Sequence, residues 1–329
     1  IEIITCCATH GYLPLLGNDN SVNGQISTAV KTHVRFFGEK PKGIWLPENA
    51  YRPGYEWSSP IDGSSFKRKG VEEYLSKHGI KYFFVDTHLI KAGEAKGVYL
   101  ERFKGLQMLW KQFNEGRSAN NKKPEELSEH RSYLVHEHAK DPVYILVRDE
   151  KTGGQVWSGD HGYPGDESYL EFHKKKFPGG LKYWKVTGNN VSLGDKLEYS
   201  PRAAFDRTST HGDHFVTLLE EIASSCGEDE NGIVALYDAE LFGHWWFEGV
   251  KWIENIFRKM KDNKLIKPET GSAHLEESKI SGKVSLPEGS WGKGGFHYIW
   301  LNDWTEWTWK KIYSAENDLS EYAKKSSGN

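Results

Sequence analysis

Short apolar runs alternate with amphipathic stretches along most of the chain. Four runs rich in β-branched and aromatic residues end in turn residues and read as strands: residues 1–5, 43–46, 81–85 and 233–237. Apolar positions that recur every three or four residues predict helices at 71–78 and 247–261. Strand followed by helix, repeated, predicts a parallel sheet of the α/β class, and the length of 329 residues suits a β/α barrel.

Two long stretches interrupt this alternation. Residues 93–141 are highly charged and contain the polar loop 116–124, which predicts an inserted, partly helical subdomain with a mobile loop. Residues 153–195 are rich in Gly, Pro and aromatic residues, which is typical of an ordered loop over a site. We therefore expect a first barrel part at 1–92, the insert at 93–141, the rest of the barrel at 142–316 and a frayed tail at 317–329.

The charge balance and the cysteines exclude several classes of protein. Lys and Arg number 43 against 46 Asp and Glu, a net charge of −3, which argues against nucleic-acid or anionic-membrane partners. No apolar run approaches the roughly 18 to 20 residues of a membrane-spanning helix. Cys6, Cys7 and Cys226 lack paired spacing, which favours a reducing, cytoplasmic setting. The chain opens on a strand-like run without Met or signal sequence, so we interpret it as a fragment.

Two carboxylates stand where apolar runs end. Glu48 follows the run 43–46, and Asp238 follows the run 233–237. In β/α barrels the carboxyl ends of the strands carry the catalytic groups. Glycosidic-bond chemistry needs two such groups, one to attack or stabilise the anomeric carbon and one, kept protonated by burial, to donate to the leaving oxygen. Taken singly, either residue is as well explained by capping the following helix or by a salt bridge.

Aromatic residues gather near these carboxylates. The chain has 13 Trp, 16 Tyr and 15 Phe, and eight of the tryptophans fall between 245 and 309. His244, Trp245 and Trp246 follow Asp238 closely, and a second cluster holds Trp291 and Trp300. Indole faces stack on sugar rings, and imidazole and indole N–H groups bind hydroxyls. Trp304, Trp307 and Trp309 follow at helical spacing, which favours packing for at least two of them, so all three are expected in the core.

Several long motifs, in order, resemble glycoside hydrolase family 57 and in particular its 1,4-α-glucan branching enzymes. Residues 1–16 are similar to the family's second motif, 45–51 to its nucleophile motif and 237–249 to its acid/base motif. Four shorter segments resemble those that mark the branching-enzyme subgroup: 148–149, 155–158, 162–166 and 193–196.

The resemblance implies a role for individual residues. Glu48 corresponds to the nucleophile and Asp238 to the general acid/base. The substrate-binding residues implied by the resemblance are His10, Arg148, Trp157, Trp291 and Trp300. They add to the candidates His244, Trp245 and Trp246. Each also has a structural explanation: His10 as a hydrogen-bonded rim histidine, Arg148 as a partner of Asp149, Trp157 as a plug beneath a Gly-rich loop. A tyrosine of the insert covers the site in such enzymes, and Tyr133 or Tyr99 would serve here.

The resemblance also implies a fold and a reaction. The family's first motif and its C-terminal helical region have no counterpart here, so we expect an incomplete (β/α)7 barrel. The implied reaction is retaining: an α-1,4-glucan segment is cleaved and transferred to a sugar 6-hydroxyl, as in glycogen biosynthesis, with the two carboxyl groups about 5 to 5.5 Å apart. The alternatives are an α-amylase or 4-α-glucanotransferase of the same family, and an inactive glucan-binding protein.

No cofactor or metal is expected. The pairs His136/His138 and His211/His214 superficially suggest metal ligands, but neither has further ligands nearby in the sequence, so surface or loop histidines explain them better. The predicted partner is an α-1,4-glucan, with no nucleic acid and no membrane.

Overall fold

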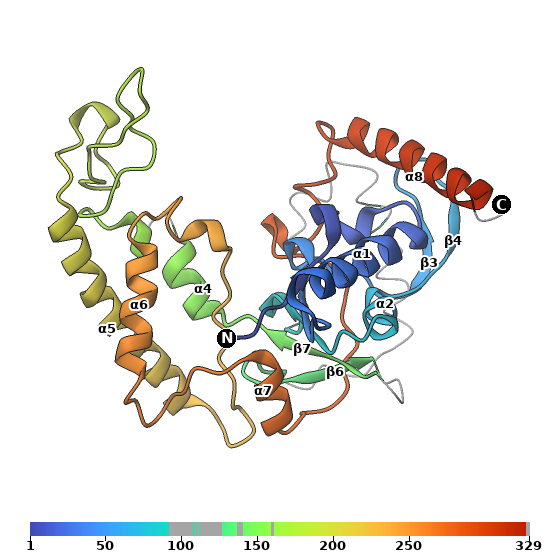
Figure 1. Ribbon diagram of the computed structural model, residues 1–329, viewed down its shortest axis with the longest axis horizontal. Helices are drawn as coiled ribbons and strands as arrows, with labels where there is room; N and C mark the ends of the chain where they lie inside the picture. Colours follow the sequence, from blue (N-terminus) through green and yellow to red (C-terminus); the bar gives the residue numbers. More distant parts are fainter. Residues whose placement is uncertain are drawn as a thin grey trace. The chain divides into compact units, whose positions relative to one another are not determined.

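The computed structural model describes residues 1–91, 127–136, 141–158 and 161–326, together with residues 107, 109 and 111. The chain forms two compact units (Figure 1). Unit 1 comprises Ile1–Val147 and Thr270–Asn329, and unit 2 comprises Arg148–Glu269. Most of the predicted insert at 93–141, with its loop 116–124, Tyr99 and His138, lies outside the described residues, so the boundaries at 92 and 141 stay predictions.

Unit 1 is built on a five-stranded mixed sheet. Its strands are β1 (Thr5–Cys6), β2 (Gly43–Trp45), β5 (Tyr82–Val85), β6 (Tyr133–His136) and β7 (Val143–Val147), in the order β1-β2-β5-β7-β6. Strands β1, β2, β5 and β7 are parallel to one another, and β6 pairs with β7 in the antiparallel sense. The central strands are buried on both faces, as their continuous apolar runs require. The predicted α/β class is confirmed, but the strand predicted at 1–5 is wrong for its first four residues, because only Thr5 of that run lies in β1.

The described part of unit 1 also contains four α-helices and an antiparallel hairpin. The helices are α1 (Asp19–Phe37), α2 (Val71–Lys77), α7 (Gly271–Glu277) and α8 (Glu306–Ser326), and the hairpin strands are β3 (Tyr55–Ser58) and β4 (Ser65–Arg68). Of these helices, α1 and α2 contact strands of the sheet. Asn18 begins α1 by accepting a hydrogen bond from the Ser21 amide, and Gly38 ends it at φ +80°. The predicted helix at 71–78 is confirmed as α2.

The C-terminal segment corrects two predictions. Residues 317–326 are helical within α8 instead of frayed. The buried Glu316 carboxylate anchors this helix, because it accepts a 2.8 Å hydrogen bond from the Gly17 amide. Trp309 packs in the core as predicted, but Trp304 is 88% exposed and Trp307 59%. Periodicity alone does not tell which helical face will be covered, and here it was wrong for two tryptophans of three.

Three α-helices are the longest elements among the described residues of unit 2. They are α4 (Glu150–Trp157), α5 (Pro201–Ser225) and α6 (Gly249–Met260), the last confirming the helix predicted at 247–261. An aromatic core joins α5 and α6: Tyr163, Tyr169, Phe215, Trp246 and Trp252. The predicted strand at 233–237 is wrong. Only Val234 pairs, with Arg148, and a ladder needs more than one paired residue.

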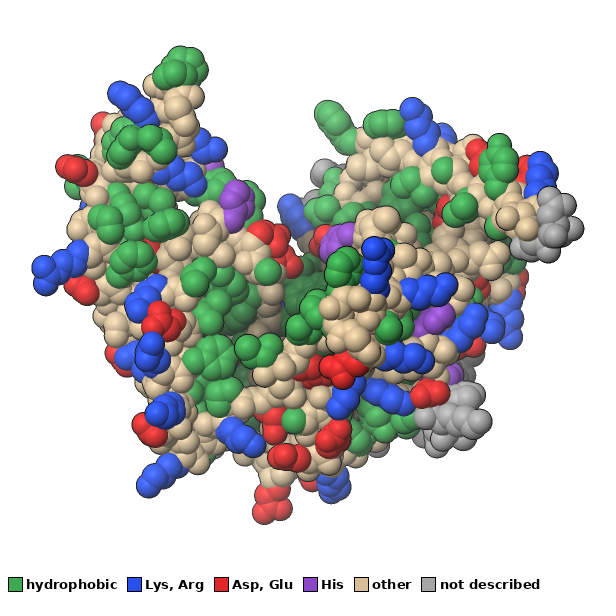
Figure 2. Space-filling view, viewed as in Figure 1, with side chains coloured by type: hydrophobic (Ala, Val, Ile, Leu, Met, Phe, Trp, Pro, Cys, Tyr) green, Lys and Arg blue, Asp and Glu red, His purple; other side chains and the backbone are tan. Residues whose placement is uncertain are grey.

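The stretch 153–195 begins inside α4 and continues through isolated bridges and the short 3-10 turns Tyr163–Gly165 and Leu193–Asp195. On the face seen in Figure 2, acidic and basic side chains both occur over each unit, in line with the net charge of −3. Within the described ranges, no helix combines the length and the apolar character needed to cross a bilayer.

Trp252 is expected to be a main source of unit 2 stability. Its indole is 2% exposed and packs against Trp246, Phe242 and Phe215. Trp252→Ala should lower the free energy of unfolding by about 3–5 kcal/mol, measured by denaturant titration with circular dichroism. The control is Trp304→Ala, which should change it by no more than about 0.5 kcal/mol. Equal effects of the two substitutions would contradict the assigned core.

Candidate active site

Glu48 lies just beyond the carboxyl end of β2, in a strained turn. The strand ends at Trp45, and the 3-10 turn Pro47–Asn49 follows at once. Glu48 and Asn49 have φ values of +60° and +48°, and the turn after β1 shows the same feature at Thr9 and His10, with +58° and +54°. Non-glycine residues adopt this conformation rarely and at a cost, and such residues cluster at functional sites. Two adjacent parallel strands therefore end in strained turns.

The Glu48 carboxylate is held through one of its two oxygens. The indole Nε1 of Trp291 donates a 2.8 Å hydrogen bond to Oε2, and the Trp291 amide donates to the Glu48 carbonyl at 3.2 Å. The other oxygen, Oε1, lies 3.8 Å from His10 Nε2, and the Glu48 side chain is 33% exposed. The carboxylate is thus oriented but accessible, and it is committed to Trp291 rather than to capping the turn that contains it.

Residues 288–300, the tryptophan loop, carry both predicted aromatic residues of this unit. Trp291 packs edge-on against Trp45 with ring centroids 5.2 Å apart, and Trp300 stacks on Tyr12 at 4.2 Å. Glycines permit this packing: a Cβ on Gly292 would lie 2.4 Å from the Trp300 ring. The structure therefore brings His10, Glu48 and Trp291 together and places Trp300 on the Tyr12 ring.

A third strand end in unit 1 supports the tryptophan loop. After β5, Asp86 Oδ1 accepts a hydrogen bond from the His88 amide and lies 3.0 Å from His88 Nδ1, while His88 Nε2 lies 3.1 Å from the Gly295 carbonyl oxygen. A Cβ on Gly295, which has φ +74°, would lie 2.7 Å from that nitrogen. His88 was not predicted from the sequence, although polar residues follow the strand end at 86–88 just as Glu48 follows its strand.

Asp238 belongs to unit 2, so its predicted separation from Glu48 stays a prediction. It immediately precedes the 3-10 turn Ala239–Leu241, and its side chain makes no capping hydrogen bond to that turn. Of the aromatic residues that follow, Trp246 is 1% exposed in the core, which leaves it no free face for a sugar. Trp245 is 49% exposed and packs on Phe172 at 4.3 Å.

The other predicted residues are spread over both units. In unit 2, exposed His244 meets Trp245 edge-on at 5.3 Å, half-buried Arg148 lies against Gly153, and Trp157 is 37% exposed at the end of α4. The expectation that Tyr133 covers the site is wrong. This tyrosine of unit 1 is 2% exposed on β6, and its hydroxyl donates to the Ser128 carbonyl at 2.9 Å, so it is a core residue.

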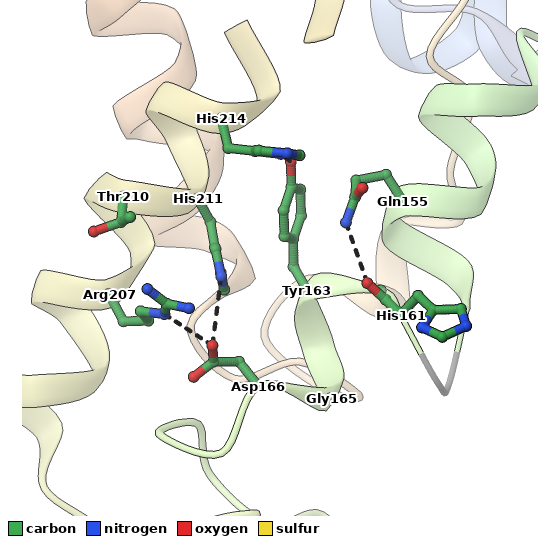
Figure 3. Close-up of a pocket in the computed structure, with 10 residues that line it drawn as sticks. Gln155, His161, Tyr163, Gly165, Asp166, Arg207, Thr210, His211 and His214 are labelled. Carbon is green, nitrogen blue, oxygen red and sulfur yellow. Dashed lines mark hydrogen bonds and ion pairs between the residues drawn. The ribbon is translucent and has the colours of Figure 1, made fainter. Parts of the chain in front are cut away.

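Unit 2 also contains a polar pocket of about 420 Å³, which was not predicted as a site although its lining includes residues of the segment 162–166 and the pair His211/His214 (Figure 3). Asp166 Oδ2 accepts a hydrogen bond from Arg207 Nε at 2.8 Å and lies 3.5 Å from His211 Nε2. The Tyr163 hydroxyl bonds His214 Nδ1 at 2.7 Å. These side chains point toward one another across the pocket and bind each other, which is typical of a structural network that joins the 3-10 turn at Tyr163 to α5.

Comparison with known proteins establishes the family. Residues 1–287 match the model of glycosyl hydrolase family 57. A 1,4-alpha-glucan branching enzyme of Thermococcus kodakarensis is 44% identical over 323 residues, which cover 97% of this chain and 44% of that protein. A probable 1,4-alpha-glucan branching enzyme of Mycobacterium tuberculosis is 28% identical over 276 residues, covering 83% of this chain and 41% of that protein. The chain therefore belongs to glycosyl hydrolase family 57, and it spans less than half the length of these relatives.

Solved structures agree with this assignment. The crystal structure of a family 57 branching enzyme of Pyrococcus horikoshii superimposes with a TM-score of 0.79 at 41% identity, over 96% of this chain and 52% of that chain. The alpha-amylase AmyC of Thermotoga maritima gives a TM-score of 0.68 at 27% identity, over 88% and 51% of the respective chains.

His211 should make the stability of unit 2 depend on pH. Burial is the main cause that lowers its pKa from 6.5 to about 4; the Arg207 cation adds to this effect and Asp166 opposes it. Between pH 6.5 and about 4, His211 is therefore protonated in the unfolded chain but not in the folded one. The free energy of unfolding should fall as the pH is lowered through this range.

Urea titrations across this pH range test the expectation. His211→Gln should remove part of the decline, whereas His161→Gln, a substitution at an exposed histidine of the same pocket, should keep it. Identical pH dependence in wild type and His211→Gln would contradict the role given to His211.

Proposed function

We propose that this chain carries the catalytic centre of a retaining 1,4-α-glucan branching enzyme, with Glu48 as nucleophile and Asp238 as general acid/base. The observation that carries the proposal is the Glu48 carboxylate, which stands at a strand end, is held by Trp291 through one oxygen and is accessible at the other. Support comes from relatives at 44% and 41% identity that are named branching enzymes.

The reaction proceeds in two displacements. A Glu48 oxygen attacks the anomeric carbon while Asp238 protonates the departing glycosidic oxygen, which forms a glucosyl ester and releases the shortened chain. The Asp238 carboxylate then takes the proton from a 6-hydroxyl of an acceptor glucan. That oxygen attacks the same carbon and releases Glu48. The Trp291 N–H bond to Oε2 keeps one carboxylate oxygen in place, which leaves Oε1, on the His10 side, for the attack.

Exposed aromatic faces suit a glucan substrate. Trp245 presents a half-exposed indole that is backed by Phe172, and His244 stands beside it as a hydroxyl-binding group. Trp157 offers a second exposed ring, and Arg148 a cation for hydroxyls in the same unit. Where an acceptor glucan occupies the site in place of water, transfer is favoured over hydrolysis.

Other reactions of the same family are the alternatives to branching. The likeness to a family 57 alpha-amylase at 27% identity makes hydrolysis the main alternative, and disproportionation by a 4-α-glucanotransferase uses the same intermediate with a 4-hydroxyl acceptor. An inactive glucan-binding protein would keep the aromatic faces without turnover. A cytoplasmic role in glycogen synthesis fits the three cysteines, which form no disulfide in the described parts of the chain.

Glu48→Gln tests the nucleophile. The amide cannot form the glucosyl ester, so amylose turnover should fall at least about a thousandfold. Glu56→Gln, at an exposed glutamate on β3, is the matched control and should keep wild-type turnover. Chain-length analysis of the wild-type product after debranching should show new α-1,6-linked chains. Unchanged turnover in Glu48→Gln would refute the nucleophile, and new reducing ends without branches would identify a hydrolase.

Trp245→Ala tests the aromatic face in unit 2. Loss of the stacking indole should raise the KM for long maltooligosaccharides about three- to tenfold, the equivalent of about 0.5–1.5 kcal/mol. The control is Phe177→Ala, because this ring is 90% exposed in the same unit and is not proposed to bind glucan. Initial rates with a series of maltooligosaccharides provide the measurement, and an unchanged KM in Trp245→Ala would contradict the assignment.

A further inference from the structure

A buried network of hydrogen-bonded polar side chains lies behind the tryptophan loop in unit 1. The Tyr12 hydroxyl bonds His297 Nδ1 at 2.7 Å, and His297 Nε2 bonds Glu288 Oε1 at 2.6 Å. The second Glu288 oxygen accepts a 2.5 Å hydrogen bond from the Tyr55 hydroxyl. Tyr12 is 6% exposed, His297 0% and Glu288 2%. Both oxygens of the carboxylate and both nitrogens of the ring are therefore used.

The donor and the acceptor of each hydrogen bond in this network can be assigned. Burial raises the pKa of Tyr12 and of Tyr55 well above the usual value, so both phenols keep their protons. A carboxylate only accepts, so His297 Nε2 donates to Glu288. In the neutral ring, Nδ1 is then the acceptor for the Tyr12 hydroxyl. These donor and acceptor assignments fix the orientation of the His297 imidazole as well as its tautomer.

Two residues of this hydrogen-bond network, Glu288 and His297, belong to the tryptophan loop and lie near its two ends. Glu288 begins the loop, and His297 lies near its end, where its carbonyl accepts the Trp300 amide at 2.9 Å. The indole of Trp300 stacks on Tyr12 with an interplanar angle of 20°. Between these anchors, Trp291 donates to Glu48. Removing the Tyr12–His297 bond would therefore loosen the surface on which Trp300 rests without altering Trp300 or Glu48.

We propose that Tyr12, His297 and Glu288 are positioning residues that set the glucan-binding geometry of Trp300 and, through the loop, of Trp291. The identity of the ligand rests on the proposed function. None of the three touches substrate, because all are buried. An apolar core of the same volume would stabilise unit 1 as well or better, so a fully bonded buried carboxylate here is better explained by the precise loop geometry it imposes.

Tyr12→Phe is the most direct test, because it removes the hydroxyl and keeps the ring on which Trp300 stacks. We expect the KM for maltoheptaose to rise about fivefold, which corresponds to the loss of one hydrogen bond, with kcat changed less than about twofold. His297→Gln, which keeps a donor for Glu288 and loses the Tyr12 bond, should give the same change. Tyr313→Phe is the matched control: its buried hydroxyl donates to the Leu15 carbonyl at 2.8 Å and not to a residue of the tryptophan loop, so its KM should stay at the wild-type value.

The split between KM and kcat separates positioning from plain stability. A merely structural role would reduce the fraction of active protein, which lowers the apparent kcat and leaves KM unchanged, and this result in Tyr12→Phe and His297→Gln would overturn the inference. Titration of tryptophan fluorescence with maltoheptaose measures the affinity without catalysis. A wild-type chain that binds maltoheptaose but forms no branches would contradict the proposed function alone, whereas one that binds no glucan would overturn both.

Discussion

One hydrogen bond, from the indole nitrogen of Trp291 to the carboxylate of Glu48, connects the two parts of unit 1 that form the candidate active site. It joins residues 243 positions apart in the sequence and is accompanied by a backbone bond between the same pair. A carboxylate at a strand end becomes a specific reagent only when its orientation is fixed. The tryptophan loop supplies that orientation, so the loop's own anchoring becomes part of the active-site design.

The anchoring has a common location, the carboxyl ends of parallel strands. The turns after β1 and β2 hold residues at positive φ, and the turn after β5 supplies His88 to the loop. Strained backbone persists only where the surroundings over-determine it. Here the surroundings are the buried sheet beneath and the tryptophan loop above, so the same contacts that fix Glu48 also maintain the strain.

Much of this arrangement could be predicted from local sequence. The apolar run that stops at Pro47 placed Glu48 at a strand end, and the motif resemblance named its family correctly. The strand predicted at 233–237 failed because a strand exists only with a pairing partner, which no local pattern specifies. The resemblance offers Tyr133 or Tyr99 as the covering residue, yet the sheet buries Tyr133; helical spacing predicts Trp304 in the core, yet it is exposed.

The Tyr12–His297–Glu288 chain was beyond sequence reasoning for a related reason. Tyr12 and His297 lie 285 positions apart, and each is unremarkable in its own segment. Only the fold shows that they share a proton network. The same holds for Phe172, which becomes meaningful as the ring behind Trp245. Residues that react can be recognised from their motifs, whereas residues that position them are defined by contacts made across the chain.

The most direct test of the account is to trap the nucleophile. Incubation with 5-fluoro-α-glucosyl fluoride should form a long-lived glucosyl ester in a retaining enzyme, because the fluorine slows its hydrolysis. Peptide mass spectrometry should then find the label on the peptide that contains Glu48, and the Glu48→Gln variant should remain unlabelled. A label on any other carboxylate would contradict the central claim that Glu48, held by Trp291, attacks the sugar.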